Sequence, residues 1–305
     1  MSDGILVTVG VLSYNSSKTI LETLNSIKEQ SYGPIELIIA DDGSSDDTVG
    51  VCNEWINNNK SRFKRVQLIK SDQNRGTSAN CNSLLATAKG VWLKIIAADD
   101  VLLTDCIQKC IDYVGDNSSI KWLVGKSLKY VDIIDEEHLK KNDIVYSKRR
   151  LSALHGTLEE QQKAIVDFNF IEAPNLFIKT EIIHEVGGYN EKYKLIEDWP
   201  LNLKLIYGGH KCFFLDEYIV GYRQSSSSVF NVKSKIFNIG YKESLFIFEK
   251  GELFKYHNLK YRVNKTLQYY LCEMYQKLGL NNSRLINVRS YSLISLVINK
   301  LFKCE

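Results

Sequence analysis

Four short polar motifs, set in order along an alternating strand–helix pattern, constrain the fold of this chain most strongly. They are Ser13-Tyr14-Asn15, Asp41-Asp42-Gly43-Ser44, Asp99-Asp100 and Glu197-Asp198-Trp199. The first three follow aliphatic and β-branched runs at residues 5–12, 35–40 and 91–98, which are typical of buried parallel strands. Ligands bind at the carboxyl ends of such strands, so the motifs predict one cleft. Its carboxylates suit a divalent cation and a phosphorylated ligand.

The rest of the pattern predicts an α/β fold with a helical extension. Helices are expected at about 17–30, 46–58, 77–88, 104–114 and 198–207, and further strands at 66–69, 122–130, 174–178, 212–215 and 219–222. The highly charged stretch 135–150 predicts a surface excursion. We therefore divide the chain into a domain at 1–232, with halves at about 1–100 and 101–232, and a basic helical region at 233–305.

Composition excludes several classes of protein. No run of about 18 uninterrupted apolar residues exists, so no membrane-spanning helix is expected. The first strand begins almost at the N-terminus, which leaves no room for a signal peptide. The seven cysteines form no CxxC pair and the five histidines no metal-binding spacing, so zinc is not expected. The odd number of unpatterned cysteines points to a reducing cytosol.

The net charge of +3 conceals an uneven distribution. Residues 233–305 carry 13 Lys and Arg against 5 Asp and Glu, a net charge of +8, which leaves −5 for residues 1–232. Within this region, segment 284–305 combines aliphatic residues at helical spacing with Arg284, Arg289, Lys300 and Lys303. The pattern predicts either a helix that lies on an anionic membrane surface or one that packs on protein.

Each motif has a catalytic and an ordinary interpretation. Asp99-Asp100 can hold Mg²⁺ or Mn²⁺, but it can also be an exposed turn. Asp42 can accept a hydrogen bond from a nucleotide, but Asp-Gly is a common turn pair. Asp198 can take a proton from an attacking hydroxyl, or it can cap the helix that it opens.

Two arginines near strand ends add candidate phosphate ligands. Arg75 follows the third strand in Asn74-Arg75-Gly76, and Arg223 ends a late strand. Either arginine can equally be a surface residue. The chain has no GxGxxG fingerprint and no Walker A loop, which argues against a dinucleotide site or a P-loop.

Taken together, the order and spacing of the motifs resemble the family 2 glycosyltransferases. The resemblance rests on residues 9–15, 35–48 and 74–100, and on Gly187-Gly188-Tyr189 followed by Glu197-Asp198, and it covers about residues 5–225. It implies the GT-A fold, a Rossmann-like, mostly parallel sheet flanked by helices. It also implies an inverting transfer from a nucleotide-diphospho sugar that depends on Mn²⁺ or Mg²⁺.

The resemblance also assigns roles to residues. Asp198 would be the catalytic base, with Glu197 and Trp199 at the acceptor. Asp100 and Asp99 would hold the metal, and Asp99 could reach the ribose. The remaining donor-binding residues would be Leu12, Tyr14, Asp42, Arg75 and Arg223. The chain departs from the family in three places. Ala97 replaces an acid two residues before Asp99, which predicts a metal site completed by water or ligand oxygens. Leu12 and Ser13 stand where the family often has Pro and Thr, and Gln224 replaces a histidine, which argues against a histidine ligand for the metal.

The resemblance further implies a UDP-linked donor and a glycan or polyprenyl-diphosphate-linked oligosaccharide as acceptor. The setting would be O-antigen or capsule synthesis, at the cytoplasmic face of the cell membrane. We keep two alternatives open at this point. A nucleotidyltransferase on a related α/β fold would need a glycine-rich triphosphate loop, which residues 9–15 lack. A non-catalytic basic binding module for nucleic acid would show a basic-helix or stacked-aromatic signature, and the chain has neither. We expect no nucleic-acid partner and leave oligomerisation open.

Overall fold

The computed structural model describes residues 4–130, 146–224 and 235–302. Its contacts divide the chain into two compact units, residues 1–224 and residues 225–305. The sequence placed this division after residue 232, which lies outside the described residues. Each unit is described by itself below.

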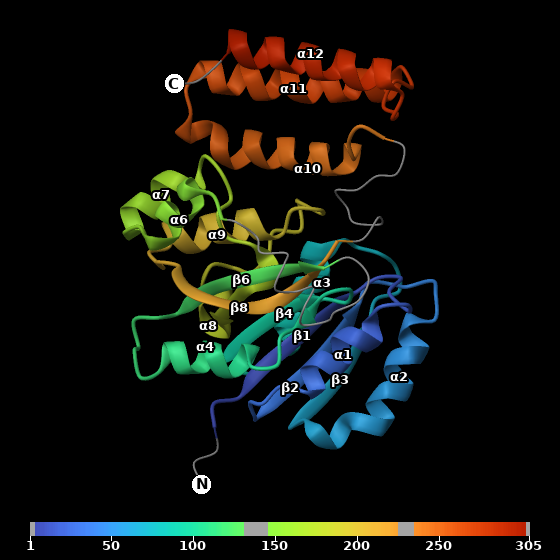
Figure 1. Ribbon diagram of the computed structural model, residues 1–305, viewed down its shortest axis with the longest axis vertical. Helices are drawn as coiled ribbons and strands as arrows, with labels where there is room; N and C mark the ends of the chain where they lie inside the picture. The colour runs from blue at the N-terminus through green and yellow to red at the C-terminus, as the bar shows by residue number, and fades with distance from the viewer. Residues whose placement is uncertain (1–3, 131–145, 225–234, 303–305) are drawn as a thin grey trace. The chain divides into compact units, whose positions relative to one another are not determined.

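The first unit is built on an eight-stranded sheet with the order β3-β2-β1-β4-β7-β6-β8-β5 (Figure 1). The first four strands of this order pair in parallel, whereas β7 pairs antiparallel with β4 and β6, and β5 pairs antiparallel with β8. The strand bounds are β1 Val7–Ser13, β2 Ile35–Asp41, β3 Arg65–Lys70, β4 Trp92–Ala97, β5 Val101–Leu102, β6 Trp122–Tyr130, β7 Leu176–Lys179 and β8 Phe213–Arg223.

The strands of the parallel half are buried on both sides, because helices cover both faces of the sheet there. Every residue of β2 is buried. On β1 the alternate residues Val7, Val9 and Val11 share a core with α1 (Ile20–Lys28), α2 (Thr48–Asn59) and α4 (Cys106–Val114). The opposite face of β1 meets α3 (Thr77–Thr87). A Cβ atom at Gly10 would lie only 2.3 Å from the side chain of Leu84, so glycine lets α3 approach the sheet closely.

The second half of this unit agrees with the sequence in some elements and differs in others. Strand β6 and helix α9 (Asp198–Tyr207) have the predicted bounds. The two predicted strands at 212–215 and 219–222 are wrong, because they form the single strand β8. Its middle residues Asp216 and Glu217 are exposed and lie next to an irregularity in the pairing of β8 with β6. In the sequence, this charged pair between two apolar runs resembles a turn.

The charged stretch 135–150 also needs correction at its end. Residues 131–145 lie outside the described residues, but Lys148–His155 form helix α6, which Ser147 caps with its side chain. The remaining elements of this half are α7 (Leu158–Ile165), the 3-10 turn η2 (Ala173–Asn175) and α8 (Thr180–Glu185).

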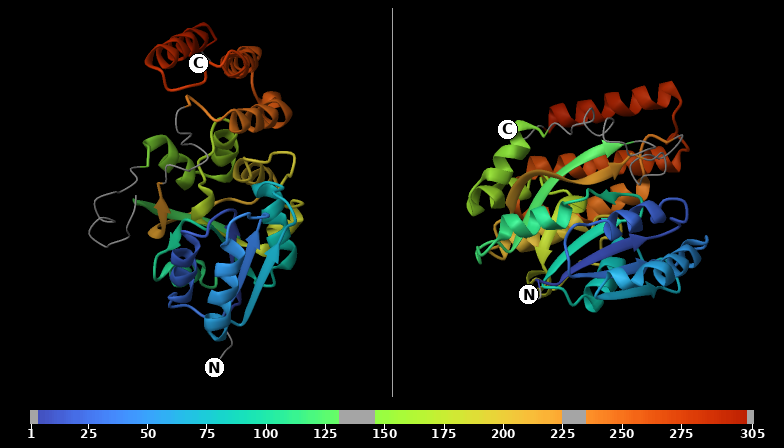
Figure 2. Two further views of the ribbon diagram at one scale, coloured as in Figure 1. Left: turned by 90° about the vertical axis from the view of Figure 1, so that its right-hand side faces the viewer. Right: turned by 60° about the horizontal axis from the view of Figure 1, so that its bottom comes forward.

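The second unit is helical, as the sequence predicted. Its main helices are α10 (Ile239–Phe248), α11 (Leu259–Lys277) and α12 (Leu285–Leu301), with short π and 3-10 segments at Glu249–Leu253 and Phe254–Tyr256. A small core forms around Phe237, Leu271, Cys272 and Tyr275. The views of Figure 2 agree that α11 and α12 run side by side. No helix in the described ranges is both long and apolar enough to span a membrane.

Candidate active site

The first three polar motifs lie at one edge of the sheet, where β1, β2 and β4 end together. In the strand register, Leu12 lies opposite Ala40 on one side and Ala97 on the other. The backbone continues this alignment, since Ala98 N donates to Leu12 O and Asp42 N to Ser13 O, both at 2.9 Å. The carboxyl ends of these parallel strands therefore bring Tyr14, Asp42 and Asp99 to the same edge.

The Asp99-Asp100 turn is held from three sides. Hydrogen bonds of 2.7–3.0 Å reach the backbone carbonyls of residues 98–100 from four side chains: Thr19 and Thr23 at helix α1, Tyr130 on β6 and Arg223 on β8. These contacts span up to 124 residues of sequence. The two aspartates are therefore fixed by tertiary structure, which distinguishes this turn from an ordinary exposed one.

Arg223 lies next to the aspartates, but its guanidinium already has protein partners. Its backbone N–H donates to Asp100 Oδ1 at 2.8 Å, and its side chain forms an ion pair with Glu22. The guanidinium carbon also lies 4.6 Å from the centre of the Tyr130 ring. Arg223 thus adds positive charge beside the two carboxylates from a fixed position.

The electrostatics of the two aspartates fit a divalent cation. Burial, with the Asp99 charge adding to it, raises the pKa of Asp100 to about 8. Burial also raises the pKa of Asp99, which Arg223 partly opposes. Two crowded carboxylates are a suitable donor set for Mg²⁺ or Mn²⁺.

The same region offers few further metal ligands. In the part of the chain that the structure describes, no group of three or more His, Cys, Asp or Glu side chains is placed to hold a metal ion. Ala97, two residues before Asp99, supplies no further carboxylate. Asp99 and Asp100 would therefore need water or ligand oxygens to complete the coordination of a cation.

Asp42 anchors the loop that carries Arg75. Its two carboxylate oxygens accept hydrogen bonds from the backbone N–H groups of Arg75 (2.9 Å) and Gly76 (2.8 Å). Gly43 has φ +74°, and a Cβ atom there would lie 2.7 Å from the carbonyl carbon of Gln73, so only glycine suits this approach. The exposed Arg75 side chain donates to Ser83 Oγ at 2.6 Å.

Tyr14 projects from the end of β1 with 49 % of its surface exposed, while Leu12 is half-buried. The turn after Tyr14 is locked by Asn15, which has φ +51° and accepts a hydrogen bond from Ser45 N at 2.8 Å. An exposed aromatic ring on a fixed turn offers a flat surface on which a nucleotide base can stack.

Asp198 begins helix α9 and is held by two hydrogen bonds. Asn169 Nδ2 donates to Asp198 Oδ2, and the Trp199 backbone N–H donates to Asp198 Oδ1, both at 2.7 Å. Asn169 is itself oriented by Asn202, whose Nδ2 donates to Asn169 Oδ1 at 3.1 Å. Burial raises the pKa of Asp198 to about 6. The pKa of Glu197 rises to about 7, because of burial and the Asp198 charge. A carboxylate with such a pKa is a suitable general base near neutral pH.

The loop before Asp198 is docked on helix α3 of the first half. Ser78 Oγ donates to Tyr193 O at 2.7 Å. Asn82 exchanges two hydrogen bonds with the backbone of Tyr189, each 2.9 Å long. Helix α3 therefore links the strand-end motifs to the segment that carries Glu197 and Asp198.

Trp199 is more constrained than the sequence indicated. Its indole N–H donates to Ile165 O at 2.7 Å, so this donor is already used within the protein. The side chain is half-buried, and an acceptor would meet the ring rather than the N–H.

The sequence did not identify several residues that build this site, among them Asn169, Glu22, Ser78 and Asn82. Ser78 and Asn82 carried a usable signal, because polar residues four apart lie on one face of a helix. Asn169 and Glu22 carried none, since their partners lie 29 and 201 residues away.

Comparison with known proteins identifies the family. Residues 8–218 match the family described as "Glycosyl transferase family 2". The chain belongs to this family. As a family 2 glycosyltransferase it is an enzyme, which excludes a non-catalytic binding module and disfavours a nucleotidyltransferase.

Curated relatives of this family 2 glycosyltransferase agree. An uncharacterized glycosyltransferase of Methanocaldococcus jannaschii is 24% identical over 85% of this chain and 79% of its own length. The Escherichia coli enzyme UDP-Glc:alpha-D-GlcNAc-diphosphoundecaprenol beta-1,3-glucosyltransferase WfaP is 34% identical over 36% of this chain and 41% of its own.

Solved structures identify the fold as GT-A. S. aureus TarS in complex with UDP-GlcNAc has a TM-score of 0.60 and 17% identity, over 87% of this chain and 72% of that one. A mannosyltransferase from Pyrobaculum calidifontis, in complex with GDP-Man and Mn²⁺, has a TM-score of 0.58 and 15% identity, over 98% of this chain and 88% of that one. The fold predicted from the sequence is confirmed.

Proposed function

We propose that this enzyme transfers a sugar, with inversion, from a UDP-linked donor to a hydroxyl of a glycan or lipid-linked oligosaccharide. The observation that carries the proposal is the pairing of two sites in one unit. One is the crowded carboxylate pair Asp99-Asp100 at the carboxyl edge of the parallel strands. The other is Asp198, a hydrogen-bonded carboxylate with a raised pKa at the start of α9.

On the donor side, Tyr14 would stack on the base, with Asp42 and Leu12 at the nucleotide. Arg75 and Arg223 would contact the diphosphate. Asp99 and Asp100 would hold Mn²⁺ or Mg²⁺, which when bound would neutralise charge that develops on the leaving diphosphate.

On the acceptor side, Asp198 would take the proton of the attacking hydroxyl. Asn169 leaves the carboxylate little freedom to turn, so its lone pairs keep a fixed direction. Glu197 and the Trp199 ring would line the acceptor. Inversion follows if the hydroxyl attacks the sugar carbon on the side opposite the leaving diphosphate.

The substrate class is supported by the relatives rather than by the site itself. The E. coli relative WfaP is named for a UDP-glucose donor and a diphosphoundecaprenol-linked acceptor. Another E. coli relative, 32% identical over 35% of this chain, is a chondroitin synthase. We infer a role in bacterial surface polysaccharide synthesis, such as O-antigen or capsule, at the cytoplasmic face of the membrane.

A donor screen tests the proposal. Purified enzyme with Mn²⁺ should hydrolyse or transfer from at least one UDP-sugar, measured as released UDP, and should show lower activity with GDP- and dTDP-sugars. Preference for a GDP-sugar would correct the nucleotide but keep the reaction. Failure to turn over any nucleotide sugar, with and without a lipid-diphosphate acceptor, would contradict the proposed function.

Helix α12 supports a peripheral membrane location. Its apolar side chains face outward: Leu285, Ile286, Leu293 and Leu301 are each more than 60 % exposed. A different face of the helix meets α11, where Tyr291 and Ile298 pack against the small core and Tyr275 Oη donates a 2.7 Å hydrogen bond to Ser290 Oγ. Exposed Arg284, Arg289 and Lys300 flank the apolar face. An apolar face with basic edges suits the interface of an anionic membrane, where each basic residue contributes about 1 kcal/mol.

We expect the enzyme to sediment with anionic vesicles at low salt, and to bind less as salt is raised. Removal of residues 284–305 should abolish the binding. The double substitution Ile286→Ser and Leu293→Ser should weaken it strongly, because both side chains are exposed and apolar. The matched pair Ile5→Ser and Val91→Ser, also exposed, should leave it unchanged. An enzyme that ignores the vesicles but forms dimers that the double substitution dissociates would show that α12 binds a second copy.

A further inference from the structure

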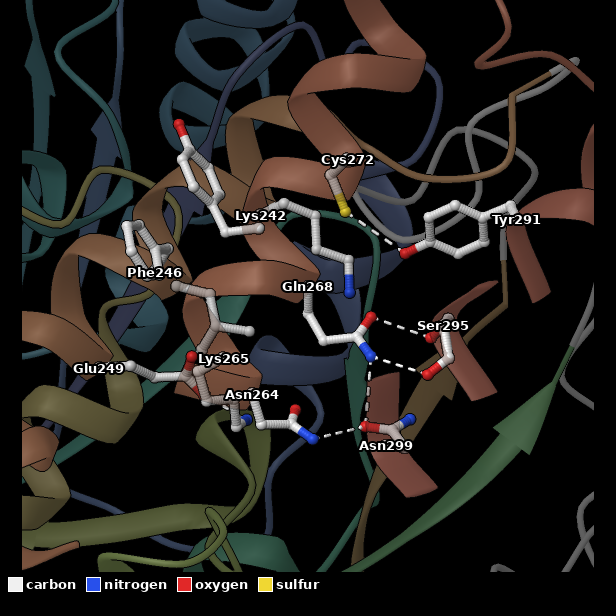
Figure 3. A pocket seen from close by; sticks show the side chains of 12 residues that line it. Lys242, Phe246, Glu249, Asn264, Lys265, Gln268, Cys272, Tyr291, Ser295 and Asn299 are labelled. Carbon is white, nitrogen blue, oxygen red and sulfur yellow. Dashed lines mark hydrogen bonds and ion pairs between the residues drawn. The ribbon is translucent and has the colours of Figure 1, made fainter. Parts of the chain in front are cut away.

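The helical unit contains a pocket that the proposed reaction does not use. It has a volume of about 260 Å³ and lies among α10, α11 and α12 (Figure 3). Twelve side chains line it, of which three are charged: Lys242, Glu249 and Lys265. These charges decide which ligand chemistry the pocket can accept.

One positive charge in the pocket is uncompensated. Lys265 forms an ion pair with Glu249, whose side chain is only 4% exposed. Among the residues that the structure describes, no carboxylate pairs with Lys242. Figure 3 shows its amino group pointing into the pocket, between Gln268 and Tyr291. The lining therefore carries a net charge of +1, which favours an anionic group.

One wall of the pocket is a fixed set of amides and hydroxyls. Gln268 Nε2 donates to Ser295 O at 3.0 Å, and Ser295 Oγ donates back to Gln268 Oε1 at 2.9 Å. Asn264 Nδ2 donates to Asn299 Oδ1 at 3.1 Å. This network uses the oxygen of Asn299 and leaves its Nδ2 group without a partner in the described residues. The Tyr291 hydroxyl, which lies 3.3 Å from Cys272 Sγ, lines the same pocket, so the pocket holds several polar groups besides Lys242.

The pocket continues onto the apolar face of α12. A second, shallow hollow shares Tyr291, Ser295 and Asn299 with it and extends to Leu296 and Lys300. The Leu296 side chain is 49 % exposed. A ligand seated here would therefore place a charged head at Lys242 and an apolar chain along α12.

We propose that this pocket binds the phosphate group of a lipid, with Lys242 as the charged ligand and Asn299 Nδ2 as a neutral donor. An ammonium and an amide N–H are both suitable donors to phosphate oxygens. The inference concerns the helical unit alone and does not depend on the sugar or nucleotide that the catalytic unit uses. The lipid can be a membrane phospholipid or a prenyl phosphate, and the test separates these sources.

The experiment is calorimetric titration of the full-length enzyme with farnesyl monophosphate, below the concentration at which this lipid aggregates. We expect saturable binding that Lys242→Gln weakens about tenfold or more, in line with a charge-assisted hydrogen bond. Lys242→Arg should retain most of the affinity, and Asn299→Ala should weaken binding less than Lys242→Gln. Lys250→Gln, which removes an exposed lysine outside the pocket, should have no effect.

Further ligands identify the group that is recognised. Farnesol lacks the phosphate and should bind no better to the parent enzyme than to Lys242→Gln. Short-chain phosphatidylglycerol that binds with equal affinity would identify a membrane phospholipid as the source, and weaker binding would identify a prenyl phosphate. The proposal is overturned if farnesyl monophosphate does not bind, or if Lys242→Gln and Asn299→Ala, both folded by circular dichroism, bind it as the parent does.

Discussion

Asp198→Asn should lower kcat by about 10²-fold or more while affinity for the nucleotide diphosphate stays close to that of the parent enzyme. The substitution keeps the shape of the side chain and one of its oxygens but removes the basic carboxylate. Calorimetry with UDP and Mn²⁺ measures the binding half of this prediction, and initial rates measure the other. Asp116→Asn, at an exposed aspartate after α4, is the matched control and should change neither quantity.

The pH profile gives an independent readout of the proposed base. As a base Asp198 must be ionised, and burial raises its pKa to about 6. With saturating Mn²⁺, which holds Asp100 in its ionised form, kcat should therefore fall as the pH drops through 6. An ordinary aspartate would keep its charge down to about pH 4. An acid limb near pH 4, or a loss of UDP affinity in Asp198→Asn as large as the loss of kcat, would assign Asp198 to folding or binding instead.

Asp100→Ala should remove almost all transferase activity, as should a chelator added to the parent enzyme. Mn²⁺ or Mg²⁺ should restore the chelated parent but not the variant, because a single remaining carboxylate binds a divalent cation weakly. Burial raises the pKa of Asp100, so its ionised form is costly in the folded state, and the variant should unfold at a temperature close to that of the parent.

Two observations make this test decisive. Asp116→Ala removes an exposed aspartate and should leave both activity and metal response unchanged. Full activity of the parent enzyme in excess EDTA would show that catalysis needs no divalent cation, in which case Arg223 and Arg75 would have to stabilise the leaving diphosphate alone.

The sequence predicted those parts of the enzyme that local patterns determine. Strand β6 and helix α9 had the right bounds because their hydrophobic patterns end at clear turn residues, such as Gly208-Gly209 after α9. The strand-end motifs could be assigned to one edge because parallel strands share their direction. Strand β8 was split in two because its exposed Asp216 and Glu217 interrupt the apolar pattern, although the backbone continues through them.

Side-chain partners from distant parts of the chain could not be predicted. Nothing near Asn169 in the sequence indicates that it holds Asp198, and nothing near Glu22 indicates that it pairs with Arg223. Helix α12 also could be predicted only in part. The helical spacing of its apolar residues predicted an apolar face, but the sequence did not show whether that face packs on protein or is exposed.

The hydrogen bond from Arg223 N to Asp100 Oδ1 joins residues 123 positions apart, and this separation sets an order of assembly. During synthesis, the strands that end at Asp42 and Asp99 emerge first, but Asp100 lacks its backbone donor until β8 has left the ribosome. Contacts of such large sequence separation form slowly. The active site is therefore completed late, and the apolar face of α12 emerges later still. A nascent chain thus exposes the apolar face of α12, which we propose binds a membrane, only after every residue of the catalytic unit has been made.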